Sequence, residues 1–306
     1  MRRVRYEHTG GPLFLEDAPV PTAGPGELLV RTEAIGVTLP TVRKVTEAAE
    51  PIPLGGEIAG EVVAVGAGVT RFAAGDRVTG LCFGHGYADY ALLNETMASP
   101  VPAGASAVDA VALVRSGLVA LGALKAARPA PGEAALITGA ASGVGHLAVQ
   151  LTRLRGASRV VGAVSAPLGK AEFVRGLGAD EVIAYDSEVW GEPVDYVLDA
   201  VGGDLLTPAV AALAPGGRLV AYSSGGGSVR AYDLLVGAKS VIGFQMARIA
   251  RNEPGRYERW REELWRLFAE EALRPAVHGE FTLEDAAEAH TAIESRSNLG
   301  KVVLRP

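Results

Sequence analysis

Gly139-Ala140-Ala141-Ser142-Gly143-Val144-Gly145 follows the apolar run Ala134–Thr138 and leads into residues 144–154, which have helical spacing. A strand, a loop of small residues and a helix in this order predict a dinucleotide-binding loop. Small side chains let the backbone approach a pyrophosphate, and the helix N-terminus offers free N–H groups and a partial positive charge. Gly145 lets the helix and the strand pack closely.

The match of this loop to the standard GxGxxG pattern is imperfect. Ala140 and Ser142 stand where two glycines are expected. The alternative interpretation is a tight strand–helix turn that binds no ligand.

The end of the next predicted strand, Arg159–Val164, favours a nucleotide site. An NAD-type site places Asp or Glu there, where it holds the ribose hydroxyls. Here Ser165 takes that place, followed by Lys170 and by Tyr185 at the end of the third predicted strand. Hydroxyls and a cation suit a ribose 2′-phosphate, so we expect these residues to bind one. The alternative for Lys170 is an ordinary surface lysine in a helical first turn.

Strand-like and helical segments alternate on the C-terminal side of the loop. The strand-like runs are 159–164, 181–185, 194–200 and 217–222, and the helical ones are 170–177 and 205–213. This alternation predicts a parallel sheet covered by helices on both faces. It stops after one more strand-like run at 241–246, and an amphipathic helix follows at 258–271.

The N-terminal third has a different character. Short β-rich runs at 13–16, 27–35, 57–65 and 77–81 alternate with Gly- and Pro-rich turns, which predicts a small barrel-like domain. A helical stretch at 106–127 follows, and the chain ends with a helix at 284–295 and a strand at 301–304. We therefore predict an α/β fold in which a Rossmann domain, residues 118–251, is inserted into a β-rich domain, residues 1–117 plus 252–306.

Length and composition agree with two globular domains. The chain has 306 residues, 48% hydrophobic composition and a net charge of -6. A mildly acidic protein lacks the basic footprint that nucleic acids and anionic membranes require, so neither is an expected partner. With a single cysteine, Cys82, neither an intrachain disulfide nor a Cys-rich metal cluster can form.

Localisation follows from the apolar segments. The start of the chain is charged and lacks an apolar signal core, so we do not expect secretion. Residues 108–127 contain Asp109, Arg115 and Lys125 and are better interpreted as a buried helix than as a membrane span. These features predict a cytoplasmic protein.

Several further motifs carry a family resemblance that extends over essentially the whole chain. They are LGGEIAGEVVAVG at 54–66, FAAGDRV at 72–78, GYADY at 86–90, the AAxGVG loop, ESR at 294–296 and GKVVL at 300–304. In this order and spacing they resemble the medium-chain dehydrogenase/reductase superfamily, and within it the zinc-free quinone oxidoreductase (zeta-crystallin-like) branch. The resemblance implies a GroES-like catalytic domain around the Rossmann domain.

The resemblance also implies NADPH as the cofactor and assigns residues to it. The loop residues Gly139 to Gly145 would hold the pyrophosphate. The residues implied to bind the 2′-phosphate are Ser165, Lys170, Tyr185 and Arg296. The residues implied to lie on the nicotinamide side are Ser223, Ser224, Phe244, Gln245 and Met246. Family members commonly pair through the strand at 241–246, and bare sheet edges invite pairing, so we expect a homodimer.

The chain departs from the superfamily at its metal and substrate positions. Zinc alcohol dehydrogenases carry Cys and His where this chain has Thr38 and Gly56, and the four-Cys structural lobe is missing, so no zinc is expected. His85 lies near Cys82, but two residues do not make a zinc site. The branch usually has Asn and Asp where Thr38 and Thr41 stand, which leaves the polarity of the substrate pocket open.

Hydride transfer to an electrophilic acceptor needs neither a protein nucleophile nor a metal, only correct placement and exclusion of water. Quinones and α,β-unsaturated carbonyls are such acceptors. Thr38 and Arg43 are the candidate donors to the accepting oxygen, and the alternative for Arg43 is a surface arginine. Two other functions stay open: an enoyl reductase of polyketide- or acyl-type thioesters, and an NADPH-binding structural or regulatory protein with little turnover.

Overall fold

The computed structural model describes residues 1–82, 84–165, 169–222 and 225–306. They form two compact units, Met1–Arg115 with Pro275–Pro306 and Ser116–Arg274. The second boundary lies later than the sequence indicated, because residues 252–274 belong to the second unit. Helix α8 (Pro254–Ala269) packs Leu264 against Gly117 of α2 (Ala107–Ala127), so closely that a Cβ on Gly117 would lie 3.0 Å from the leucine methyl groups.

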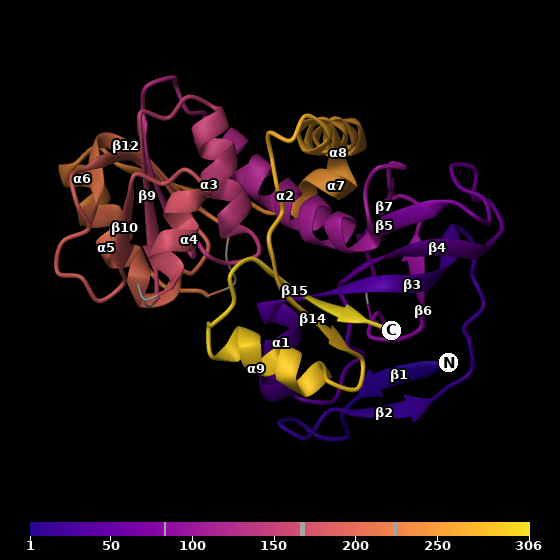
Figure 1. Ribbon diagram of the computed structural model, residues 1–306. Coiled ribbons are helices and arrows are strands. Elements are labelled where there is room, and N and C mark those ends of the chain that lie inside the picture. Colours follow the sequence, from indigo (N-terminus) through magenta and orange to yellow (C-terminus); the bar gives the residue numbers. More distant parts are fainter. Residues whose placement is uncertain (83, 166–168, 223–224) are drawn as a thin grey trace. The chain divides into compact units, whose positions relative to one another are not determined.

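The second unit contains a six-stranded, all-parallel sheet (Figure 1). Its order β10-β9-β8-β11-β12-β13 is the 3-2-1-4-5-6 order of Rossmann sheets, with the direction of winding reversing between β8 and β11. The strands are β8 (Ala134–Thr138), β9 (Arg159–Val164), β10 (Glu181–Ala184), β11 (Val194–Asp199), β12 (Leu213–Ala221) and β13 (Ser240–Gly243).

Apolar strand residues place this sheet in the interior. Leu136 and Ile137 of β8 are successive residues that point to opposite faces, and both are fully buried. The connecting helices are α3 (Gly145–Leu154), α4 (Lys170–Gly176), the short 3-10 helix Gly203–Leu205, α5 (Leu206–Ala211) and α6 (Ala231–Val236). The strand predicted at 241–246 is shorter than expected, because the chain leaves the sheet after Gly243 and enters α7 (Met246–Asn252).

The first unit is built on a sheet ordered β14-β15-β3-β4-β5-β7, in which β6 also pairs with β3. Strand β15 (Lys301–Arg305) lies antiparallel to β3, so the last strand of the chain belongs to the sheet of the first unit. The other elements are β1 (Arg2–Arg5), β2 (Phe14–Asp17), β3 (Glu27–Val37), α1 (Leu39–Glu47), β4 (Glu57–Val65), β5 (Arg77–Leu81), β6 (Tyr90–Asn94), β7 (Ala98–Pro100), β14 (Val277–Thr282) and α9 (Ala286–Glu294).

Helix α2 is long and apolar enough, by length and composition alone, to cross a membrane. However, 78% of its most apolar 18-residue stretch is buried inside the protein. This burial agrees with the interpretation of residues 108–127 as a core helix.

A buried histidine in the first unit should make stability depend on pH. His290 is 5% exposed, packs edge-on against Tyr87 and lies with Nε2 3.2 Å from the tyrosine oxygen. Burial lowers the pKa of His290 to about 4. Between the usual value near 6.5 and this value the unfolded chain binds the additional proton, so stability falls as pH falls.

We expect His290 to account for a decrease of about 2–3 kcal/mol in the free energy of unfolding between pH 7 and pH 4.5. Urea unfolding at the two pH values measures the total decrease in stability of each protein. The decrease should be smaller by that amount in His290→Gln than in the wild-type protein, and the difference is the contribution of the histidine. Equal decreases in the two proteins would show that His290 does not contribute to the pH dependence of stability.

Candidate functional site

The loop between β8 and α3 is a tight, internally bonded turn. Gly139 has a φ of 64°, in the left-handed region that glycine favours. The Ser142 amide donates to the Gly139 carbonyl at 2.8 Å, and the Gly145 amide donates to Ser142 Oγ at 3.0 Å. A Cβ on Gly145 would lie 1.9 Å from the Gly139 carbonyl oxygen, so no side chain fits there. The turn therefore leads directly into α3, which begins at Gly145.

A neighbouring glycine accommodates Ala140, one of the two departures from the glycine pattern. Ala140 is fully buried, and a Cβ on Gly162 of β9 would lie 3.1 Å from its methyl group. Gly162 thus leaves the space that Ala140 fills. Ala141 is also buried, whereas Ser142, Gly143 and Val144 are partly exposed at the rim of the turn.

Ser165 and Lys170 come together beside this loop. Lys170 Nζ donates to Ser165 Oγ at 2.8 Å, and the lysine is only 9% exposed, which is unlike an ordinary surface lysine. The ammonium group and the hydroxyl together can bind an anion.

Tyr185 connects this cluster to the loop. Ala184 is the partner of Val164 in the parallel sheet, so Tyr185 and Ser165 leave neighbouring strands at the same edge. The Tyr185 hydroxyl accepts from the Gly139 amide at 2.9 Å, and its ring stacks on Trp190 with centroids 6.4 Å apart. Of the other residues assigned to the cofactor, Arg296 lies in the first unit just after α9, and Ser223 and Ser224 lie outside the described residues.

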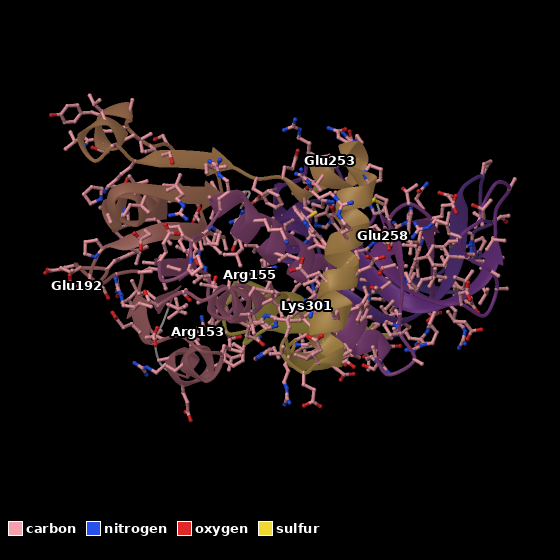
Figure 2. All side chains as sticks on the ribbon, turned by 90° about the horizontal axis from the view of Figure 1, so that it is seen from above. Arg153, Arg155, Glu192, Glu253, Glu258 and Lys301 are labelled. Carbon is pink, nitrogen blue, oxygen red and sulfur yellow. The ribbon has the colours of Figure 1, made fainter. Side chains whose placement is uncertain are left out.

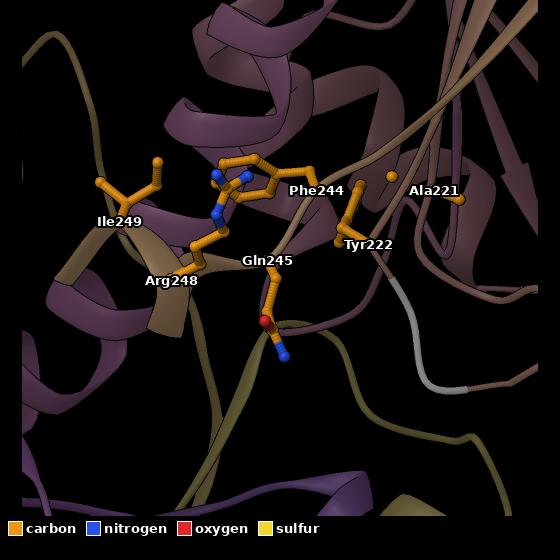
Figure 3. A pocket seen from close by; sticks show the side chains of 7 residues that line it. Ala221, Tyr222, Phe244, Gln245, Arg248 and Ile249 are labelled. Atoms are coloured by element: carbon orange, nitrogen blue, oxygen red, sulfur yellow. The ribbon is translucent and has the colours of Figure 1, made fainter. Parts of the chain in front are cut away.

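A pocket of about 490 Å³ lies at the carboxyl ends of β12 and β13 (Figure 3). It is lined by Ala221, Tyr222, Gly243, Phe244, Gln245, Arg248 and Ile249. The family resemblance implied that Phe244 and Gln245 lie on the nicotinamide side, and it did not single out Arg248.

Packing against α2 holds the Phe244 wall of the pocket in place. A Cβ on Gly122 would lie 2.3 Å from Phe244 Cζ and 3.0 Å from Met246 Cε. Trp260 of α8 lies on the same glycine, with its ring 6.5 Å from that of Phe244. Met246 therefore packs with its side chain toward α2 and does not line the pocket. A glycine inside an otherwise helical stretch is the sequence signal that could have revealed Gly122.

The two candidate catalytic residues lie at α1. Thr38 caps this helix by accepting from the Thr41 amide at 3.4 Å, and its Oγ1 lies 3.1 Å from Thr41 Oγ1. Since Thr41 Oγ1 donates to the Gly55 carbonyl at 3.0 Å, the hydroxyl hydrogen of Thr38 points to Thr41. Thr38 must release Thr41 before it can donate to a substrate oxygen.

Arg43 is engaged on the surface of α1. Its Nε lies 3.6 Å from the Glu47 carboxylate, one turn later, and its side chain is 36% exposed. This pairing favours the interpretation of Arg43 as a surface arginine.

The positions that bind zinc in alcohol dehydrogenases carry no ligand set here. In the ranges that the structure describes, no three His, Cys, Asp or Glu side chains cluster closely enough to hold a metal ion. Cys82 is buried, and burial raises the pKa of its thiol to about 11. Gly56 brings no side chain and lies near Thr41.

A buried ion pair lies next to these positions and was not expected from the sequence. Glu57 and Lys301 are 2% and 3% exposed and form an ion pair, and Lys301 is labelled in Figure 2. Arg115 adds a second cation, with Nη1 3.1 Å from Glu57. The pair packs over Gly36, where a Cβ would lie 2.7 Å from the carboxylate and 2.8 Å from Lys301 Cε.

Two family models and several known proteins match this chain. The model of the alcohol dehydrogenase GroES-like domain matches residues 24–106, and that of zinc-binding dehydrogenases matches residues 177–304. A quinone oxidoreductase of Pseudomonas aeruginosa is 32% identical, with 100% of this chain and 99% of that protein covered. A spectinabilin polyketide synthase protein of Streptomyces orinoci is 34% identical over 94% of this chain, which spans 14% of that protein.

Among solved structures, a mycobacterial protein in complex with NADPH is similar over the full length of both chains. Its TM-score is 0.92, and the two sequences are 31% identical.

Proposed function

Because this chain belongs to the quinone oxidoreductase branch of the medium-chain dehydrogenase/reductase superfamily, we propose that it is an NADPH-dependent reductase of quinones or α,β-unsaturated carbonyls. The observation that carries the choice of cofactor is the contact between Lys170 and Ser165, at a strand end that has no acidic residue. The similar mycobacterial structure in complex with NADPH supports the same choice.

Different residues of the second unit would bind different parts of NADPH. The turn from Gly139 to Gly145 brings backbone N–H groups at the start of α3 to the pyrophosphate, and Ser165 with Lys170 binds the 2′-phosphate. Phe244 and Gln245, at the ends of the strands beyond the reversal point, form the wall on the nicotinamide side. When bound there, NADPH would supply a hydride to the electrophilic carbon of the acceptor, and a proton from water would complete the two-electron reduction.

The reaction proceeds without zinc in this proposal. Thr38 and Gly56 stand where zinc-dependent members of the superfamily carry metal-binding side chains. The acceptors named above are already electrophilic, so no Lewis acid is needed to polarise them.

A second function is favoured by the similarity to polyketide synthase proteins: reduction of an enoyl thioester by the same hydride transfer. Steady-state oxidation of NADPH with a panel of quinones, a panel of simple enones and a panel of enoyl thioesters separates the two. The proposal predicts the highest kcat/KM with the quinones or simple enones. Turnover with the thioesters alone would select the second function, and none with any acceptor would select a binding protein with little turnover.

We also propose that the protein forms a homodimer through the β13 edge of its sheet. The described sheet ends at β13, and the neighbouring helix α6 exposes large apolar side chains. They are Tyr232, Leu235 and Val236, each at least 68% exposed, and Val241 of β13 extends the patch. Apolar side chains of this size gathered at a sheet edge suit burial against a second copy.

Leu235→Glu should therefore shift the protein from dimer to monomer. Light scattering at micromolar concentration measures this shift. Val189→Glu is the matched control, because Val189 is equally exposed at 73% but lies away from β13, after β10. A monomeric wild-type protein, or equal dissociation by both changes, would contradict the proposed interface.

A further inference from the structure

The pocket at the ends of β12 and β13 holds one charged side chain, Arg248 of α7. In the described parts of the chain, no carboxylate forms an ion pair with this guanidinium and no acceptor forms a hydrogen bond with it. Figure 3 shows the side chain reaching from α7 toward the Phe244 side of the pocket, while the Gln245 amide points the other way. The neighbouring lining groups are apolar or neutral, so Arg248 determines the charge of the pocket.

The acidic residues that follow α7 do not neutralise this charge. Glu253 is 2.9 Å from its partner Arg256, and Glu258 is paired with Arg261 (both glutamates are labelled in Figure 2). Helix α7 itself contains arginines at 248 and 251 and no acid. The pocket therefore presents a cation that is available to a ligand.

The residues that would hold the cofactor's phosphates lie three or more strands away from β13, the strand that precedes α7 and Arg248. The pyrophosphate turn follows β8, which is three strands from β13, and Ser165 with Tyr185 lies at the ends of β9 and β10. With strands about 4.8 Å apart, these distances are roughly 14 Å and more, measured across the sheet. An arginine side chain does not bridge them.

We propose that Arg248 binds an anionic group of the acceptor, so that the preferred substrates are α,β-unsaturated carbonyl compounds that carry a carboxylate or a phosphate. This inference rests on the proposed hydride transfer and specifies its substrate class. Arg248 donates hydrogen bonds to the anionic group and orients the acceptor in the pocket. It takes no part in the bond changes, in which a hydride from NADPH forms the new C–H bond and water supplies the proton.

The test compares matched acceptors with wild-type protein, Arg248→Gln and the control Arg251→Gln. One pair is an enone carboxylate and its methyl ester; the other is an enoyl thioester of coenzyme A and the same acyl group on N-acetylcysteamine. We expect kcat/KM for the anionic member of at least one pair to fall about tenfold in Arg248→Gln. The neutral members and the KM for NADPH should change little, and Arg251→Gln should behave as wild type. The pair that responds identifies carboxylate or phosphate as the source of the charge.

A binding measurement tests the same contact without turnover. Calorimetric titration of NADP⁺-loaded protein with a saturated keto acid should give a Kd about tenfold weaker in Arg248→Gln, with Arg248→Lys in between. If the neutral acceptors are reduced but the anionic members show no dependence on Arg248, this inference is wrong while the proposed reductase function stands. If none of these acceptors and no quinone is reduced, and the keto acid binds both proteins equally, both are wrong.

Discussion

Lys170→Ala should weaken the binding of NADPH by about one to two orders of magnitude and leave the binding of NADH nearly unchanged. The two cofactors differ only in the 2′-phosphate. Lys170 Nζ is 2.8 Å from Ser165 Oγ, at the strand end where the phosphate would lie, and a hydrogen bond to a charged group contributes about 1.5–3 kcal/mol. NADH offers nothing for the ammonium to bind. Titrating nicotinamide fluorescence with each cofactor gives both dissociation constants.

Lys170→Arg is the matched control, because it retains the positive charge at this position. It should retain most of the discrimination between the two cofactors. Equal losses of NADPH and NADH binding in Lys170→Ala would mean that the largely buried lysine only supports the fold.

Glu57→Gln should destabilise the folded protein by about 3–5 kcal/mol. The change keeps the shape of the side chain but leaves Lys301, 3% exposed, without the carboxylate that pairs with it. Burial already lowers the pKa of Lys301, and the charge of Glu57 acts in the opposite direction. Without Glu57 the pKa falls further, so below the usual lysine value the unfolded chain binds more protons and the stability of the variant rises with pH.

Urea unfolding at pH 7 and at pH 9.5 measures both effects, and the deficit of Glu57→Gln against wild type should shrink at the higher pH. Glu61 lies in the same strand as Glu57 and forms an exposed ion pair with Arg31 of β3, so Glu61→Gln should cost at most about 1 kcal/mol. If Glu57→Gln costs no more than Glu61→Gln, the buried pair does not stabilise the first unit.

The second unit could be predicted closely from the sequence because its signals are local. Strands β8 and β9 have the expected bounds, since a parallel sheet covered on both faces needs continuous apolar runs. The turn at Gly139 and the position of Ser165 could be predicted because each residue directly follows an apolar, strand-like run. Ser165 and Lys170 were expected to bind the same phosphate, and in the structure the two side chains form a hydrogen bond.

Other features depend on contacts between distant parts of the chain. Glu57 and Lys301 are 244 residues apart, and nothing in either local sequence indicates the pair. The packing of Leu264 on Gly117 assigns α8 to the second unit, which a change in composition near residue 252 could not reveal. Gly162 leaves space for Ala140 across two strands, and Arg248 lines a pocket only because α7 begins immediately after β13.

The proposed function is tested most directly by initial rates of the wild-type protein with NADPH and with NADH, against one quinone acceptor, before and after exhaustive chelation. We predict a kcat/KM for NADPH at least about tenfold above that for NADH, unchanged by the chelator. A preference for NADH, or an activity that is lost on chelation and restored by Zn²⁺, would contradict it.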